Sequence, residues 1–320
     1  MPGPALVTGA TGFAGSHLVE HLLRDAKRVA AWANPGGRRP ADDAAGRILW
    51  KAVDLFDHAA LTAALTELSP SAIYHCAGVA HVGQTWSDPT RALRVNVLGT
   101  QRLLDAMIDA GLSCPVLIAG SALVYRQSAE ALTEDDPLGP SSPYGVSKLA
   151  QEMVGAREPR LTVILTRPFN HAGPRQDDAY VTSSFARQIA RIEAGMQPPV
   201  LRVGNLAARR DITDVRDTVR AYRLLVERGQ PHRPYNICSG RADAVSDVLE
   251  MLLAMSSASI DVQPDADRMR PSDNPVVLGD PARIAAEAGW QPEVPLEQTL
   301  RDLLDYWRGE TTRESRVTRS

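Results

Sequence analysis

Short apolar runs alternate with longer segments of helical periodicity through the first half of the chain. Continuous apolar runs bounded by turn residues are typical of strands that a parallel sheet buries on both faces. They are found at Ala5–Thr8, Val29–Ala33, Ile48–Val53, Ala72–His75, Val116–Ala119 and Thr162–Thr166. Apolar residues at helical spacing occur between them, at Phe13–Arg24, Ala59–Leu68, Pro89–Ala110 and Tyr144–Ala156. This alternation predicts an α/β fold with a doubly wound parallel sheet covered by helices.

The pattern changes after Arg167-Pro168, where Pro/Gly-rich loops begin to separate the elements. Short strands are predicted near Leu201 and Tyr235, and helices at Ser183–Ala194, Asp214–Arg228, Ser246–Met255 and Leu296–Trp307. We therefore predict a nucleotide-binding domain over residues 1–168 and a smaller mixed α/β substrate lobe over 169–308. This lobe is expected to cap the carboxyl edge of the sheet, with part of 211–230 packing back on the first domain. The polar segment 309–320 is predicted to be a disordered tail.

Composition narrows the class of protein. The net charge of −3 over 320 residues gives no basic field, so nucleic acid is not expected as a partner. No apolar run approaches the ~20 residues of a membrane span, and no signal peptide is visible. Cys76, Cys114 and Cys238 are widely scattered, which favours reduced thiols over a disulfide framework or a metal site. We expect a cytoplasmic, metal-free protein that does not bind membranes.

A glycine-rich loop follows the first predicted strand and opens the first helix. Its glycines are Gly9, Gly12 and Gly15, with Thr11 and Phe13 between them. Such a loop turns tightly, lets the backbone approach a pyrophosphate and presents the helix N-terminus to the phosphates. The loop therefore predicts a Rossmann-type dinucleotide site.

The end of the second predicted strand indicates which dinucleotide is bound. An acidic residue there would bind the ribose hydroxyls of NAD, but this chain has Asn34, followed by Arg38 and Arg39. Guanidinium groups bind a 2′-phosphate well, so NADPH is favoured, although NADH stays possible and a solvated basic loop is the alternative reading. Asp54, after the third strand, could accept a hydrogen bond from the adenine amino group or simply stabilise a turn.

Tyr144 and Lys148 lie four residues apart and so share one helix face. A free phenol has a pKa near 10, and a lysine within ~4–6 Å favours the phenolate and makes the group a usable acid/base. Ser121 follows the apolar strand Val116–Ala119 and could share a substrate oxygen with the tyrosine. We predict that Ser121, Tyr144 and Lys148 form the catalytic set.

The chain resembles the extended short-chain dehydrogenase/reductases, in the sugar-nucleotide epimerase/dehydratase group. Besides the glycine loop and the Tyr144/Lys148 pair, the resemblance rests on three motifs: His75-Cys76-Ala77-Gly78, Asn96-Val97-Leu98-Gly99-Thr100, and Ser121 with Tyr125. It covers residues 4 to about 308. It implies further cofactor contacts from Leu55, Ala77, Gly78, Asn96 and Pro168.

Three later segments are similar to the branch of GDP-mannose 4,6-dehydratases and GDP-4-keto-6-deoxy-D-mannose reductases. They are Arg167–Gln176, Val203–Leu206 leading to Arg209–Asp211, and Arg270–Asp273 leading to Leu278–Asp280. By this similarity Asn170, Arg210 and Arg270 hold the diphosphate of a GDP-linked sugar, Asp273 binds a ribose hydroxyl, and Arg175 also contacts the substrate. Ordinary surface arginines are the alternative reading.

The second residue after Ser121 separates the reactions within this branch. The dehydratases that the chain resembles carry an acid there to remove the sugar C5 proton, whereas Leu123 has no basic atom. His81 or Glu152 could replace that base, although nothing in the sequence favours either. We expect NAD(P)H-dependent reduction of the C4 ketone of GDP-4-keto-6-deoxy-D-mannose to GDP-D-rhamnose, with Leu123 against the sugar methyl group.

Other readings remain open. A nucleotide-sugar 4-epimerase would use the same three catalytic residues, and a GDP-mannose 4,6-dehydratase would need another base. A non-catalytic cofactor-sensing protein would not need Ser121, Tyr144 and Lys148 together. The resemblance also implies a homodimer, in which the helices around Pro89–Ala110 and Tyr144–Ala156 pair with their symmetry mates.

Overall fold

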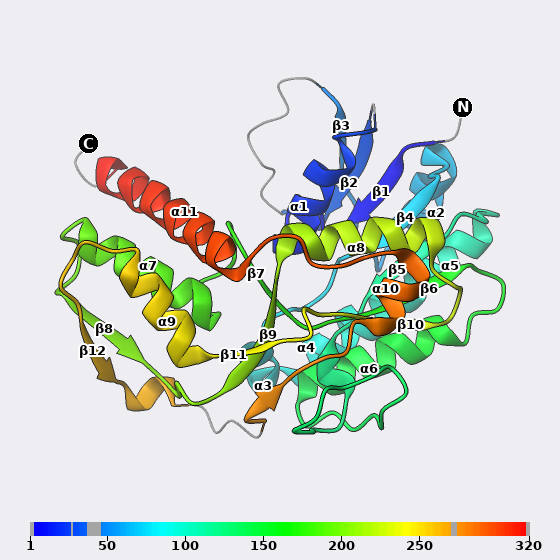
Figure 1. Cartoon of the computed structure of the whole chain (residues 1–320). Helices are drawn as coiled ribbons and strands as arrows, with labels where there is room; N and C mark the ends of the chain where they lie inside the picture. Colours follow the sequence, from blue (N-terminus) through cyan, green and yellow to red (C-terminus); the bar gives the residue numbers. More distant parts are fainter. Residues whose placement is uncertain (1–2, 27, 37–45, 270–273, 318–320) are drawn as a thin grey trace.

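A single parallel sheet forms the larger body of the protein, in a computed structural model that describes residues 3–26, 28–36, 46–269 and 274–317. Its strands lie in the order β10-β6-β5-β4-β1-β2-β3, and every neighbouring pair is parallel (Figure 1). The predicted doubly wound sheet is confirmed. The strands are β1 Ala5–Thr8, β2 Val29–Ala33, β3 Ile48–Ala52, β4 Ala72–His75, β5 Val116–Ala119, β6 Val163–Pro168 and β10 Pro234–Ile237.

The strand near Tyr235, which the sequence placed in the second lobe, is the edge strand β10 of this sheet. It pairs in parallel with β6, and both Tyr235 and Ile237 are fully buried. The assignment was wrong because the chain returns to the sheet only after a long excursion through the other lobe. A pairing between residues so far apart leaves no local signal in the sequence.

Helices cover both faces of the sheet. Side chains alternate along a strand, so in β1 Val7 packs on one face of the sheet and Leu6 on the other. The first face carries α1 Phe13–Leu22, α8 Val215–Arg228 and α10 Ala282–Ala288. The opposite face carries α2 His58–Leu68, α5 Gly99–Asp109 and α6 Pro143–Ala156.

The long helix predicted over Pro89–Ala110 is interrupted by a wider turn. It consists of α4 Pro89–Ala92, the π-helical η1 Leu93–Leu98, and α5. Asn96, in the π-helical turn, is fully buried. Its amide bonds both backbone groups of Val79, at 2.8 and 3.2 Å, and the Ser147 hydroxyl at 2.9 Å. The turn therefore fixes the segment after β4 against α6.

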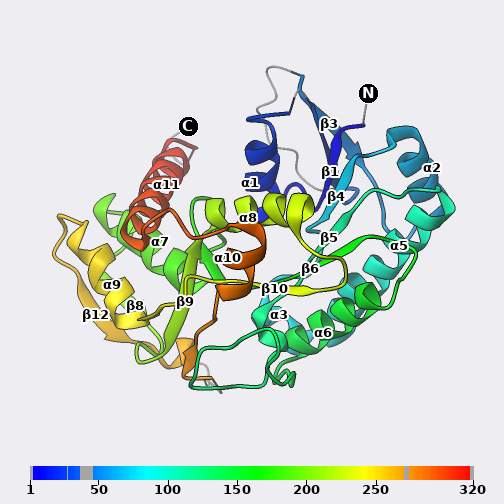
Figure 2. The same cartoon turned by 45° about the vertical axis from the view of Figure 1, so that its right-hand side comes forward.

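The smaller lobe packs three helices against short strands around its own apolar core (Figure 2). Its helices are α7 Val181–Glu193, α9 Val245–Ala254 and α11 Leu296–Val317, and a short 3-10 turn, η3, spans Ala266–Arg268. Strands β8 Val200–Val203 and β12 Asp261–Pro264 form one pair. Strand β9 Arg209–Asp214 pairs with β7 Asn170–Ala172, β11 Ala242–Ala244 and β13 Val276–Val277.

The tail predicted to be disordered from residue 309 is helical as far as Val317, where α11 ends. This part of α11 is held against α7: Thr311 is buried, and Glu314 pairs with Arg191 at 2.6 Å. The prediction of disorder rested on the polar composition of this segment. It was wrong because the contacts that hold the helix come from a distant element, α7. No helix within the described ranges is long and apolar enough to cross a bilayer.

Candidate active site

A cavity of about 660 Å³ opens at the carboxyl edge of the sheet, between the two lobes. It brings together most of the residues predicted for the site. Those that line it are Gly9, Gly12, Phe13, Gly15, Gly78, Ser121, Leu123, Tyr144, Lys148, Pro168, Asn170, Arg175 and Arg210.

The glycine loop at one end of the cavity has no room for side chains. Gly9 has φ +65°, and a Cβ there would lie 2.6 Å from the Ala77 nitrogen. A Cβ on Gly15 would lie 2.2 Å from the Gly9 oxygen. The backbone is thus bare where α1 begins, and the unpaired N–H groups of a helix N-terminus attract phosphate. These residues fit the pyrophosphate of a dinucleotide cofactor.

Ser121 and Tyr144 face each other across the cavity floor. Ser121 caps the short 3-10 turn η2 Ala122–Val124, and its Oγ accepts from the Leu123 nitrogen at 3.1 Å. Burial, with a smaller effect from the Tyr180 phenol, raises the pKa of Tyr144 above its usual range, while a hydrogen bond with Ser121 opposes that rise. Tyr144 is therefore a protonated phenol at neutral pH, ready to donate; the lowering of its pKa by Lys148 that the sequence led us to expect does not outweigh burial here.

Lys148 lies one turn after Tyr144 on α6, with Nζ 5.9 Å from the centre of the Tyr144 ring. The ammonium donates to the Ala119 carbonyl and to Gln151 Oε1, both at 2.8 Å. Burial lowers the pKa of Lys148 to about 8, against a smaller opposing effect of the Cys76 thiol. A Cβ on Gly78 would lie 3.6 Å from Nζ, so bare backbone adjoins the ammonium on the cavity side.

A buried ion pair anchors α6 to the sheet. Glu152 accepts from Arg167 of β6 through both oxygens, at 2.5 and 2.9 Å. Arg167 also donates to the Tyr125 hydroxyl at 2.9 Å and the Glu134 carbonyl at 3.0 Å. Glu152 is therefore engaged away from the cavity and is not positioned to act as a base.

Some predicted cofactor residues do not line the cavity: Thr11, Asn34, Asp54, Leu55, Ala77 and Asn96. Asn96 lies behind the wall, where it supports Val79 rather than facing a ligand. Asp54 accepts from the Phe56 nitrogen at 2.9 Å, as a turn carboxylate does. Arg38, Arg39, Arg270 and Asp273 lie outside the described residues.

The second lobe contributes cavity residues that sequence reasoning missed. Tyr180, just before α7, donates to the Ala80 carbonyl at 3.0 Å across the cleft, and its ring lies 6.0 Å from that of His81. His81 caps the short helix α3 Val82–Ser87. His171 stacks on Phe13 with ring centres 5.6 Å apart. The contacts of Tyr180 with Ala80 and of His171 with Phe13 join residues about a hundred or more positions apart, so no local pattern predicts them, although His171 lies in the segment Arg167–Gln176.

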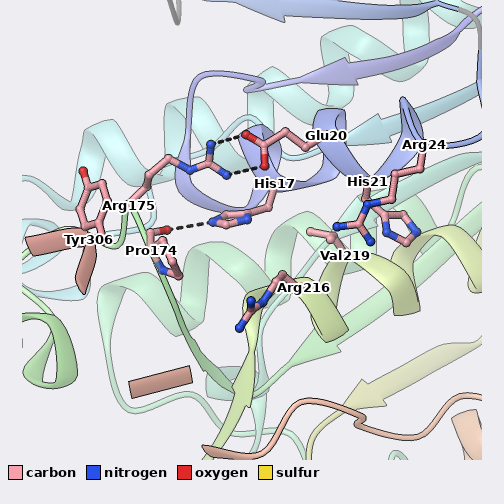
Figure 3. A pocket seen from close by; sticks show the side chains of 9 residues that line it. All are labelled: His17, Glu20, His21, Arg24, Pro174, Arg175, Arg216, Val219 and Tyr306. Atoms are coloured by element: carbon pink, nitrogen blue, oxygen red, sulfur yellow. Dashed lines mark hydrogen bonds and ion pairs between the residues drawn. The ribbon is translucent and has the colours of Figure 1, made fainter. Parts of the chain in front are cut away.

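Behind the glycine loop lies a second cavity of about 350 Å³, which contains none of the catalytic set (Figure 3). Arg175, predicted to contact substrate, lines both cavities, and its guanidinium forms a bidentate pair with Glu20 of α1. Arg216 is held by Asp214 and Asp302, each at 2.7 Å. The arginines of this cavity are thus largely neutralised by carboxylates, unlike those of an open anion site.

The parallel sheet, the bare glycine loop and the buried Ser121–Tyr144–Lys148 set define an oxidoreductase of the short-chain dehydrogenase/reductase type. Within it, the chain belongs to the GDP-mannose 4,6-dehydratase family, whose model matches residues 6–303. The resemblance inferred from the sequence is thereby confirmed.

Individual relatives are similar over nearly their whole length. GDP-6-deoxy-D-mannose reductase of Pseudomonas aeruginosa is 36% identical over 96% of this chain and 98% of its own. GDP-mannose 4,6-dehydratase of Vibrio cholerae is 28% identical over 95% and 93%. The solved structure of RMD from Pseudomonas aeruginosa complexed with NADPH has a TM-score of 0.83 and 34% identity, covering 96% of this chain and 99% of that one.

We predict that Tyr144→Phe lowers turnover by about 10²–10⁴-fold, because only the transferable proton is removed. Cofactor affinity should stay nearly unchanged. Loss of nicotinamide absorbance measures turnover, and nicotinamide fluorescence measures binding. The matched control is Tyr306→Phe, in the second cavity, which should retain full activity. A Tyr144→Phe enzyme that keeps more than about a tenth of the wild-type rate would contradict the assignment.

Proposed function

We propose that the protein is an NADPH-dependent 4-ketoreductase that converts GDP-4-keto-6-deoxy-D-mannose to GDP-D-rhamnose. The observation that carries this proposal is Leu123, an aliphatic side chain in the cavity wall beside Ser121. In the dehydratases that the chain resembles, an acid stands at this position. Reduction of a ketone needs no second base, so Leu123 is compatible with it.

The ionisable groups around the cavity support the same choice. Asp177 is the one carboxylate among the described residues that line the cavity. It is exposed, and its Oδ1 accepts from the Ala179 nitrogen at 2.9 Å. Glu152, the alternative considered from sequence, is paired with Arg167. His81 Nδ1 accepts from the Gln84 nitrogen at 3.0 Å, so that ring nitrogen already has a partner.

The protonation state of Tyr144 fits the reductive direction. When bound, the reduced nicotinamide supplies a hydride to the C4 carbonyl carbon. Tyr144, whose pKa burial raises, retains its proton and transfers it to the carbonyl oxygen, which becomes the hydroxyl. Ser121 hydrogen-bonds the same oxygen, and Lys148 places a positive charge beside the phenol and binds the cofactor ribose.

The choice of substrate and cofactor is supported by the relatives and by the cavity lining. The similar Pseudomonas protein is named for a GDP-linked deoxysugar, and the solved structure of RMD holds NADPH. Asn170 and Arg210 line the cavity, where an amide and a guanidinium would bind a diphosphate. We further propose that Arg270 and Asp273 complete this site and that Arg38 and Arg39 bind the cofactor 2′-phosphate.

We predict that the protein turns over GDP-4-keto-6-deoxy-D-mannose many times with NADPH. The loss of nicotinamide absorbance measures the rate, and mass spectrometry identifies the alcohol product. With GDP-mannose and oxidised cofactor, the same protein should form no 4-keto product, because Leu123 cannot remove the C5 proton. A product lighter by one water, formed over many turnovers, would instead establish a dehydratase.

We predict that changing Arg38 and Arg39 together to Ala weakens NADPH binding by at least about tenfold, because charge-assisted hydrogen bonds to the 2′-phosphate are lost. NADH lacks that phosphate, so its affinity should change little. Fluorescence titration of both cofactors measures the difference. Equal losses for NADPH and NADH would show that these arginines do not contact the 2′-phosphate.

We also propose that the protein is a homodimer. We further propose that it is located in the cytoplasm, where reducing conditions suit its three free thiols. Large apolar side chains are exposed on α3, η1 and α6, which pack side by side: Trp86, Leu93, Leu98, Val146 and Met153. A patch of this kind is typical of a protein interface.

Light scattering at micromolar concentration is predicted to give twice the chain mass of 34.6 kDa. Changing Leu98 and Met153 together to Arg should give the monomer, because charges would be buried in the interface. Met269→Arg, an exposed apolar site on the other lobe, serves as the control. A monomeric wild type would refute the dimer.

A further inference from the structure

A continuous set of buried polar side chains extends from Lys148 away from the cavity. Gln151 Nε2 donates to the Thr100 hydroxyl at 2.8 Å. His75 lies between that hydroxyl, 2.9 Å from Nε2, and the Thr8 hydroxyl, 2.8 Å from Nδ1. Gln151, Thr100 and His75 are fully buried. The set therefore joins α6, α5, β4 and β1 directly beneath the candidate active site.

The direction of each hydrogen bond follows from the available protons. The Thr100 hydroxyl donates to the Asn96 carbonyl at 2.7 Å, so it can only accept from its other two neighbours. A neutral His75 must then donate from Nε2 and accept at Nδ1. Its other neighbour, the Thr8 hydroxyl, is the donor to Nδ1 and accepts from the Ala77 nitrogen at 3.3 Å.

This arrangement fits a neutral imidazole, since a protonated His75 would donate from Nδ1 to the Thr8 oxygen and the Thr8 proton would lose the acceptor it has here. Burial and the nearby Lys148 charge lower the pKa of His75 to about 3, which agrees with a neutral ring. The set is thus fully satisfied without any charge of its own.

The orientation of Gln151 follows from the same reasoning. Its amide nitrogen must face Thr100, because that hydroxyl has no proton to give, so its oxygen faces Lys148. We propose that Gln151 is a positioning residue, which directs the Lys148 ammonium towards Tyr144 and the cofactor and supplies a neutral acceptor in place of a carboxylate. This inference rests on the proposed redox function of the site.

Within the part of the chain that the structure describes, the groups that face Lys148 from other elements add no negative charge. Cys76 follows β4, and burial raises the pKa of its thiol. On α6 itself, burial raises the pKa of the Tyr144 phenol. From β5 comes the Ala119 carbonyl. With His75 neutral as well, the protein solvates the ammonium through two oxygens, those of Ala119 and Gln151, and the amide is the one that substitution can change.

The test is the pH dependence of kcat/KM for NADPH, which reports the groups of the free enzyme. In the wild type, activity should fall as Lys148 loses its proton near pH 8. In Gln151→Glu, a carboxylate favours the ammonium and should move this fall to higher pH by about 1–3 units. In Gln151→Met, loss of the acceptor should move it to lower pH by about 1 unit.

The pH at which activity falls should thus shift in opposite directions in the two variants if Gln151 positions the Lys148 charge. A purely structural role would lower the activity of both variants without shifting the midpoint of either pH profile. Gln291→Glu, an exposed residue in the loop before α11, makes the same change in net charge and should leave the profile unchanged. The pH dependence of NADPH affinity, followed by nicotinamide fluorescence, should shift in the same way.

This binding measurement needs no sugar, so it stays valid if the proposed substrate is wrong. If Gln151→Glu does not fold, Gln151→Met carries the test alone. Midpoints that agree with wild type within about 0.3 pH units, or that move in the same direction in both variants, would overturn the inference.

Discussion

A buried cation needs oxygen partners at close range, and this constraint determines how the buried polar residues behind the active site are arranged. The Lys148 ammonium is removed from water by the sheet edge on one side and by its own helix on the other. An isolated charge in such a place would be neutralised or would unfold its surroundings. The carbonyl at the end of β5, the Gln151 amide and the hydroxyls behind it are arranged so that the ammonium persists without a counter-ion. Its charge is therefore available to the phenol and the cofactor.

The elements that hold this arrangement come from distant parts of the chain. A second buried cation, Arg167, differs from Lys148 in having a counter-ion. Glu152 neutralises it, and the pair fixes α6 to β6. Gln151 and Glu152 are adjacent in sequence. The same helix, α6, therefore presents an amide to Lys148 and a carboxylate to Arg167. Exchanging these two acceptors would neutralise the lysine and leave the arginine without a counter-ion, with neutral acceptors alone.

Sequence reasoning succeeded where the cause of a structure is local. Apolar runs located β1 to β6, and glycine spacing located the bare loop before α1. It was wrong for the strand at Tyr235 and for the end of α11, because both depend on contacts with remote elements. Tyr180 and the hydrogen-bonded set from Thr8 to Gln151 were missed for the same reason: their members are ordinary residues until the fold brings them together. Asn96 was recognised as important, but the structure gives it a supporting place behind the wall.

The π-helical turn at Leu93–Leu98 has a consequence for how this region can vary among relatives. A π turn holds one more residue than the α-helical turn it replaces, and each residue of an α-helix advances by about 100°. Removing a single residue there would restore an ordinary α-helical turn, so the later side chains of α5, Thr100 among them, would stay close to their present facing, and the change would fall on the turn itself, where Asn96 bonds Val79. The turn can therefore lose or regain one residue without disturbing the contact between Thr100 and His75, and what such a change alters is the hold of Asn96 on the segment after β4.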